Sequence, residues 1–169
     1  KSKWKFLPPS KKKFLIFDGI INPFHKYFKK KDMNVLYRRG EEINFFILIN
    51  CILNFSLNSW TYYRLFIKYS DPKIILTAID NSIVFYRLKE ITKIPTISVQ
   101  NTQRTYMDDL SSIKKISKTQ NFFVDYMFTF NKRTSKDYQK YILGNKIDIG
   151  SFLSNSEFIK YKKKRKKCC

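Results

Sequence analysis

Short apolar runs alternate with longer amphipathic segments along almost the whole chain. Six runs have the form of buried strands, at residues 13–18, 34–37, 73–79, 95–99, 125–130 and 146–149. Six segments have the length and polarity of helices, at residues 23–31, 43–57, 60–69, 82–92, 108–118 and 135–143. Strands that alternate with helices need crossover connections. The pattern therefore predicts an α/β fold, a Rossmann-like doubly wound and mostly parallel sheet of about six strands with helices on both faces.

The longest apolar run is INFFILINCILNFSL, at residues 43–57. Asn44, Asn50 and Asn54 interrupt it, and it is shorter than the roughly 20 residues that cross a bilayer. We therefore favour a core helix with amides along one stripe over a membrane-inserting segment. Because no other apolar run approaches a bilayer-spanning length, we expect a cytoplasmic protein.

Polar residues follow the predicted strands. In doubly wound sheets, ligands bind beyond the carboxyl ends of the strands, at the point where the strand order reverses. The residues at these ends are Asp18 and Gly19, Arg38 to Glu41, Asp80 and Asn81, Gln100 and Asn101, Asn131, and Gly150 and Ser151. We expect them to form a ligand-binding edge.

Two of these strand ends allow both a structural and a functional interpretation. Asp80 and Asn81 either cap a helix or present a carboxylate and an amide to a sugar or acceptor hydroxyl. Gln100, Asn101 and Arg104 cluster after a strand, where they either contact a ligand or are solvated in a loop. The sequence leaves both alternatives open.

A third strand end carries charge. Arg38 and Arg39 precede Glu41, so they either form a local network at a helix start or reach an anionic ligand such as a phosphate. Asn44 lies three residues further along the chain.

The chain is strongly basic, with 34 Lys and Arg against 13 Asp and Glu and a net charge of +21. Lys, Ile, Asn, Phe and Tyr supply 87 of 169 residues, which is typical of an AT-rich coding sequence. A phosphate-binding protein would be expected to use more than 7 Arg, the better bidentate partner. The composition therefore disfavours nucleic acid as a partner. The segment KYKKKRKK predicts a basic, disordered tail at residues 156–169 that could contact anionic lipid at the membrane.

Several common sites are missing from the sequence. It contains no G-x-G-x-x-G, no phosphate-binding G-x-x-x-x-G-K-[ST] and no G-x-S-x-G. His25 is the single histidine, so a histidine-based metal cluster is excluded. Of the three cysteines, Cys51 lies in an apolar run and is expected to be a buried thiol, which fits a reducing cytoplasm.

Four motifs occur in an order that resembles the amino-terminal half of bacterial surface-carbohydrate biosynthesis proteins of glycosyltransferase-B type. They lie in PKIILTAIDNSIVFYRLK, IPTISVQNTQR, FVDYMFTFNKRTSKDYQKYI and IDIGSFLSN. In that family a D-N pair is followed by I-Q-N-G-x-R, D-Y-x-x-x-F and G-S-F segments. FLIFD and VLYRRGEEIN are also similar to its opening segments, so the resemblance covers residues 13–155. Thr102 stands where the family has glycine.

The resemblance implies that residues 1–155 form the acceptor-side domain of a polysaccharide biosynthesis enzyme. Such an enzyme transfers a sugar or related group from a nucleotide-sugar donor, which is a substrate, to a glycan or lipid-linked acceptor. It needs no bound cofactor or metal. The donor would bind mainly in a carboxy-terminal Rossmann domain, and this chain stops near the place where that domain would start. We therefore expect it to be incomplete alone.

The same resemblance implies a set of site residues. Asp80, as a base, would line the cleft with Asn81, Gln100, Asn101 and Arg104; Arg38, Glu41 and Asn44 would lie near its edge, and Gly150 and Ser151 at its exit. Two alternatives stay open: a basic module that binds nucleic acid or anionic membrane, and a Rossmann-like protein without a ligand. The basic tail could also hold the protein at the inner face of the membrane, whether the chain transfers a sugar or is a basic binding module.

Overall fold

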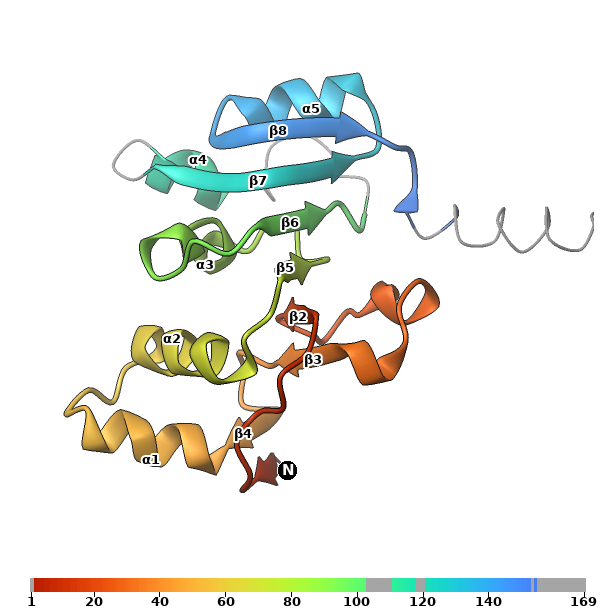
Figure 1. Cartoon of the computed structure of the whole chain (residues 1–169). Coiled ribbons are helices and arrows are strands. Elements are labelled where there is room, and N and C mark those ends of the chain that lie inside the picture. The colour runs from red at the N-terminus through yellow and green to blue at the C-terminus, as the bar shows by residue number, and fades with distance from the viewer. Residues whose placement is uncertain (1, 103–110, 118–120, 153, 155–169) are drawn as a thin grey trace, which may run out of the picture.

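A six-stranded parallel sheet organises the computed structural model, which describes residues 2–102, 111–117, 121–152 and 154. Its order is β3-β2-β5-β6-β7-β8, and all neighbouring strands are parallel (Figure 1). The strands are β2 (Phe14–Phe17), β3 (Met33–Leu36), β5 (Ile74–Thr77), β6 (Thr96–Val99), β7 (Phe122–Thr129) and β8 (Ile142–Asp148). Each overlaps a predicted strand, so the predicted Rossmann-like α/β fold is confirmed.

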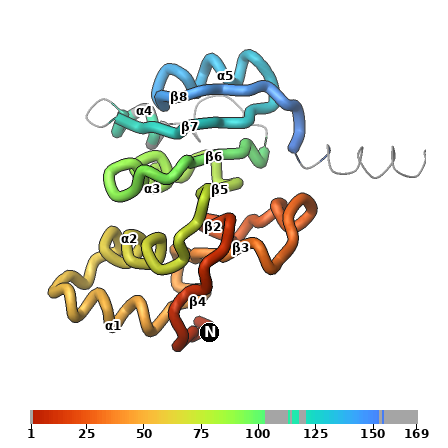
Figure 2. The backbone as a smooth tube through the Cα atoms, in the orientation of Figure 1, coloured from red at the N-terminus to blue at the C-terminus, as the bar shows by residue number. Residues whose placement is uncertain are grey.

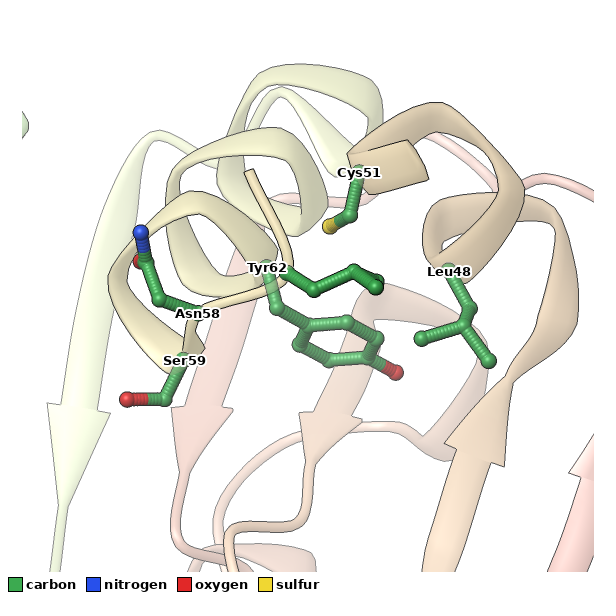
Figure 3. A pocket seen from close by; sticks show the side chains of 6 residues that line it. Leu48, Cys51, Asn58, Ser59 and Tyr62 are labelled. Atoms are coloured by element: carbon green, nitrogen blue, oxygen red, sulfur yellow. The ribbon is translucent and has the colours of Figure 1, made fainter. Parts of the chain in front are cut away.

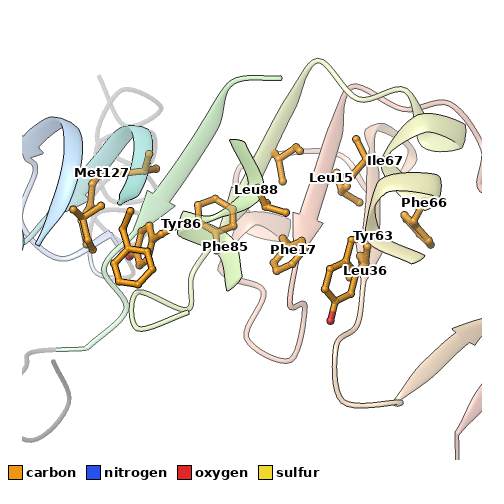
Figure 4. Close-up of a cluster of buried hydrophobic side chains, with 14 of the residues drawn as sticks. Leu15, Phe17, Leu36, Tyr63, Phe66, Ile67, Phe85, Tyr86, Leu88 and Met127 are labelled. Atoms are coloured by element: carbon orange, nitrogen blue, oxygen red, sulfur yellow. The ribbon is translucent and has the colours of Figure 1, made fainter. Parts of the chain in front are cut away.

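The larger core lies between the sheet and its helices. Because successive strand residues point to opposite faces, Leu15 and Phe17 of β2 reach this core, where Phe17 packs against Tyr63 and Phe85 (Figure 4). The helices that cover this face are α2 (Ser59–Ser70), α3 (Ile83–Tyr86) with the 3₁₀ turn η3 (Leu88–Glu90), α4 (Ser111–Ser117) and α5 (Lys132–Gln139).

The second face is covered by the connection between β2 and β3. Here Ile16 packs in a smaller core with Phe24 and Met33. The helix predicted at residues 23–31 is wrong, because this segment forms two 3₁₀ turns, η1 (Pro23–Lys26) and η2 (Lys30–Asp32). The connection joins adjacent strands and buries Pro23 and Phe24, which leaves no room for a longer helix along the sheet.

A second, two-stranded sheet lies beside the main one. Strand β1 (Lys3–Lys5) pairs in parallel with β4 (Glu42–Asn44), and α1 (Phe45–Leu53) follows directly (Figure 2). The helix predicted at residues 43–57 is therefore shorter at both ends. Only Ile47 and Cys51 of α1 are buried, so the expected core helix is instead a surface helix with an exposed apolar face.

No helix within the described part of the chain has the length and apolar character needed to cross a membrane. The basic tail predicted at residues 156–169 lies outside the described residues. The predicted domain boundary at residue 155 lies there as well, so both stay predictions.

Gly144 allows β7 and β8 to pair closely. Its φ is +108°, and a Cβ at this position would lie 1.7 Å from the carbonyl oxygen of Val124. The register between the two strands shifts between Phe123 and Tyr126, beside this contact. Glycine is therefore required both by backbone conformation and by the close approach of a neighbouring strand.

We expect Gly144→Ala to destabilise the protein strongly. A residue with a side chain costs about 1–2 kcal/mol in this left-handed region, and the clash with backbone adds about 1–3 kcal/mol. Gly150→Ala is the matched control, since its φ is +73° but no atom lies within 4 Å of the added Cβ. Urea unfolding of both variants measures the difference. Equal losses of stability would contradict the close-approach argument.

Candidate functional site

The strand order reverses between β2 and β5. From β2 the chain turns to β3 on one side, and the later strands of the main sheet, β5 to β8, are added on the other side. A crevice at the carboxyl ends of the strands is expected at such a point. Asp18 follows β2, Arg38 follows β3 by two residues, and Ser82 lies beyond β5. Asp18, Arg38 and Ser82 form what we call the switch-point cluster.

Arg38 joins the three members of this cluster. Its Nη1 lies 3.4 Å from Asp18 Oδ2 and donates to Ser82 Oγ at 3.2 Å. Asp18 is fully buried and has a φ of +60°, which is uncommon for a residue other than glycine. Its backbone N–H donates to the carbonyl of Leu36 at 2.9 Å, which fixes the turn after β2.

Two atoms of the cluster are buried without a hydrogen-bond partner in the described structure, Asp18 Oδ1 and Arg38 Nε. Leaving buried polar atoms unpaired is costly, so they mark a place where a further partner would be stabilising. The Arg38 side chain keeps 25% of its surface exposed. A carboxylate oxygen beside a guanidinium can accept from a hydroxyl while the guanidinium binds an anionic group.

Asp80, the predicted base, lies beyond β5 at the same edge, but its side chain is fully enclosed. Tyr138 Oη of α5 donates to its Oδ2 at 2.6 Å, and Tyr86 Oη donates to its backbone carbonyl at 2.7 Å. These bonds connect the edge of the sheet to α3 and α5. Asn81, the next residue, is exposed. Because Asp80 has no exposed surface, an acceptor hydroxyl would reach its carboxylate only if the side chains that bury it moved.

Gln100 and Asn101 follow β6, next to β5 in the sheet. Gln100 is buried, its Oε1 accepts from the N–H of Phe130, and its Nε2 donates to the carbonyl of Thr102, both at 2.9 Å. Its amide therefore connects the ends of β6 and β7. Asn101 Oδ1 is buried with no hydrogen-bond partner among the described residues. The predicted Arg104 lies outside the described residues.

The residues predicted near the cleft edge have other partners. Asn44 is buried at the junction of β4 and α1, where its Oδ1 accepts from Ile47 N–H and its Nδ2 donates to the carbonyl of Leu7. Glu41 accepts from the N–H of Arg39. Asn44 thus belongs to the two-stranded sheet, whereas Arg38 belongs to the edge of the main sheet.

Gly150 and Ser151 follow β8, and the chain then returns towards the β2–β3 connection. Phe152 packs against Tyr27 and Phe24, with ring centroids 4.4 and 5.6 Å apart, and Tyr27 Oη donates to its carbonyl. The strands of the main sheet are parallel, so the residues that follow them lie at the same end of the sheet, the carboxyl edge. The predicted site residues at this end are Arg38, Asp80, Asn81, Gln100, Asn101, Gly150 and Ser151.

The sequence placed Asp18 only in the general ligand-binding edge, and Ser82 was expected to do no more than cap a helix. Asp18 was among the strand-end residues, and the available signal was a buried run that ends in an acid and a glycine. A Cβ on Gly19 would lie 2.0 Å from Val35 Cγ1, so glycine allows β2 and β3 to approach at this turn. Ser82 carried no signal, because its importance comes from Arg38, 44 residues earlier.

A titratable cluster lies at the amino end of β6. Asp125, from the D-Y-x-x-x-F motif, accepts from Thr96 N–H at 2.7 Å and lies 2.6 Å from Lys89 Nζ. Burial raises the pKa of this carboxyl, but the hydrogen bonds from Lys89 and Thr96 outweigh it and hold the pKa below its usual value. Asp125 therefore ties β6, β7 and η3 together and is not part of the ligand edge.

Within the described ranges, no group of three or more His, Cys, Asp or Glu side chains comes together as a metal site. The metal-independent chemistry implied by the family resemblance stays a prediction.

A pocket of about 220 Å³ lies between α1 and α2, away from this edge (Figure 3). Its lining residues are Leu48, Cys51, Leu57, Asn58, Ser59 and Tyr62. Burial raises the pKa of the Cys51 thiol, which disfavours the reactive thiolate. The expectation of a buried Cys51 is confirmed, and this lining supplies no charged group for catalysis.

We expect Arg38→Met to lower the free energy of unfolding by about 2–4 kcal/mol, because it leaves the buried Asp18 carboxylate without its cation. Adding Asp18→Asn should recover most of this loss, since asparagine removes the charge and tolerates positive φ. A double-mutant cycle by urea unfolding measures the coupling. Additive effects of the two substitutions would contradict a direct ion pair.

We expect the stability difference between the natural chain and Asp125→Asn to be largest at neutral pH. Folding lowers the Asp125 pKa. Its contribution to the free energy of unfolding is therefore complete above the ordinary pKa of 3.8 and disappears as the pH falls through the folded-state pKa. Unfolding measured from pH 7 to pH 2 tests this. Asp137→Asn, in an exposed pair with Lys140, is the control and should have little effect at any pH. A pH-independent difference for Asp125→Asn would contradict the assignment.

Comparison with known proteins gives one match. Residues 97–169, less than half of the chain, match the model of a family described as "putative O-antigen biosynthesis protein". No curated protein and no solved structure matches the chain. The matched part includes Gln100, Asn101, Gly150 and Ser151, whereas the switch-point cluster precedes it. The match supports a link between this chain and surface polysaccharide biosynthesis.

Proposed function

We propose that the chain is the acceptor-side part of a glycosyltransferase-B-like enzyme of surface polysaccharide biosynthesis. The enzyme would transfer a sugar or related group from a nucleotide-activated donor to a glycan or lipid-linked acceptor. The observation that carries this proposal is the switch-point cluster, in which the unpaired Asp18 Oδ1 lies beside the partly exposed Arg38. The family match over residues 97–169 supports the same process.

The cluster has the chemistry to bind a phosphorylated sugar. Asp18 is fully buried, so its Oδ1 would accept from a sugar hydroxyl after the side chains that cover it had moved. Arg38 would bind a phosphate with the guanidinium atoms that do not contact Asp18 or Ser82. The exposed Asn81 amide, beyond β5 at the same edge, would add donors and an acceptor for further hydroxyls. Asn101, with its unpaired Oδ1, would extend the site towards β6.

Asp80 is the proposed base towards the acceptor hydroxyl. Because Tyr138 Oη donates to its carboxylate, this role requires the ligand to displace that hydroxyl. The nucleotide sugar would bind mainly in a second, carboxy-terminal Rossmann domain of the enzyme. Lipid-linked acceptors are presented at a membrane, so the proposal locates the protein in the cytoplasm, at the inner face of the membrane.

The test compares one amide at each end of the sheet. We expect the chain to bind sugar phosphates and acceptor oligosaccharides in titration calorimetry, and Asn81→Ala to weaken binding by roughly tenfold, the value of about one hydrogen bond. Asn121→Ala is the matched control, because Asn121 is also exposed but directly precedes β7, at the amino ends of the strands. Equal effects of both substitutions would contradict a site at the carboxyl edge.

The absence of binding to any sugar phosphate or acceptor would count against the whole proposal. Binding of unrelated oligonucleotides that weakens steeply with salt would instead support the basic binding module. To test the transfer reaction, nucleotide sugars and acceptors are added to the chain and to a version extended by its downstream reading frame. Turnover by neither form would contradict glycosyl transfer.

A further inference from the structure

Helix α1 exposes a continuous apolar ridge. Phe45, Ile49, Ile52 and Leu53 are spaced as i, i+4, i+7 and i+8, so they share one face of the helix, and all four are exposed. Phe55 and Leu57, in the loop after the helix, are also exposed. We call Phe45, Ile49, Ile52, Leu53, Phe55 and Leu57 the α1 ridge. The opposite face of α1, with Ile47 and Cys51, packs in the core.

Strand β1 and the residue that follows it extend this surface with further large side chains. The rings of Trp4 and Phe6 lie 6.3 and 5.6 Å from the ring of Phe45, and both side chains are at least half exposed. Phe55 is 100% exposed at a loop position with a φ of +50°. Soluble monomers rarely expose a contiguous apolar surface of this kind without a partner.

The charges around the ridge indicate which partner fits. Residues 2–13 and 43–70 contain no Asp or Glu, and their basic residues are Lys3, Lys5, Lys11, Lys12, Lys13, Arg64 and Lys68. Three acids flank these two segments, Glu41, Glu42 and Asp71, so the basic residues still outnumber the acids. Lys5 Nζ lies 3.4 Å from Glu42 Oε2, and Lys11 Nζ lies 3.1 Å from Asp71 Oδ2. A second copy of the chain would bring the same positive charges together. An anionic surface is complementary to them, and tryptophan with lysine is typical of the membrane interface.

We propose that the α1 ridge docks the protein on an anionic bilayer surface, with Phe55 at the boundary between headgroups and acyl chains. This contact is distinct from binding by the basic tail, which would be electrostatic alone. Leu57 of the ridge is one of the residues that line the pocket between α1 and α2. Leu48 and Cys51 also line it, so an acyl chain would find apolar contacts there (Figure 3). The inference does not depend on the proposed sugar transfer.

The test is flotation of the full chain with vesicles of phosphatidylcholine alone and of phosphatidylcholine mixed with phosphatidylglycerol. We expect binding to the mixed vesicles, and a decrease of roughly tenfold or more for Leu53→Gln with Phe55→Asn. Glutamine suits an exposed helix position and asparagine tolerates positive φ, so both should fold. Circular dichroism and thermal unfolding check this.

Leu143→Gln is the matched control. Leu143 on β8 is 57% exposed, compared with 69% for Leu53. It lies in an outer strand of the main sheet and does not belong to the α1 ridge. It should leave vesicle binding unchanged. A direct readout comes from Trp60→Phe, which leaves Trp4 as the single tryptophan. Its emission should shift to shorter wavelength when mixed vesicles are added.

Three outcomes would overturn the inference. One is binding that survives Leu53→Gln with Phe55→Asn but disappears at high salt, which would assign the contact to basic segments. Another is a dimer in light scattering that the same double substitution dissociates, which would assign the ridge to a second copy. The third is no binding to either vesicle. None of these outcomes bears on sugar-phosphate binding, so the two proposals fail separately.

Discussion

The structure depends on the burial of strand β2 on both faces. Leu15, Ile16 and Phe17 have no exposed surface and Phe14 is partly buried, because β2 lies inside the sheet between β3 and β5 and both of its faces are covered. Leu15 and Phe17 supply the core under the helices, while Ile16 supplies the smaller core under the 3₁₀ turns. A shift of β2 by one residue would exchange these side chains between two differently shaped cores. The position of Asp18, directly after this strand, is fixed as a consequence.

Most polar groups at the carboxyl edge are used by the fold itself. The amide of Gln100 connects β6 to β7, and the carboxylate of Asp80 accepts from Tyr138 on α5. A polar residue at a strand end is therefore weak support for a site on its own. The atoms that matter are those with no hydrogen-bond partner among the described residues, Asp18 Oδ1, Arg38 Nε and Asn101 Oδ1. They lie beyond the ends of β2, β3 and β6, on both sides of the point where the strand order reverses.

The strands could be predicted because each contains a short apolar run between turn residues, which is the typical pattern of a parallel strand buried on both faces. The helix at residues 43–57 could not be placed correctly, because periodicity does not say which apolar face meets the core. Asn44 ends a strand and caps α1, which stops the helix from starting earlier. The partner of Arg38 could not be predicted either. Asp18 lies 20 residues before it and Ser82 lies 44 residues after it, and only the parallel arrangement brings the three together.

The switch-point cluster and the α1 ridge both use residues from one short part of the chain, which limits the distance between the two surfaces. Arg38 in the switch-point cluster and Phe45 in the α1 ridge are seven residues apart, so their Cα atoms are within about 25 Å even for a fully extended segment. This segment is held by the pairing of β4 with β1 and by the cap on α1, which limits how far the two surfaces can move apart. The amino-terminal end of the ridge would therefore lie within about 25 Å of the arginine proposed to bind phosphate. A lipid-linked acceptor could then reach the site without leaving its bilayer, which is a reason for one chain to carry both surfaces.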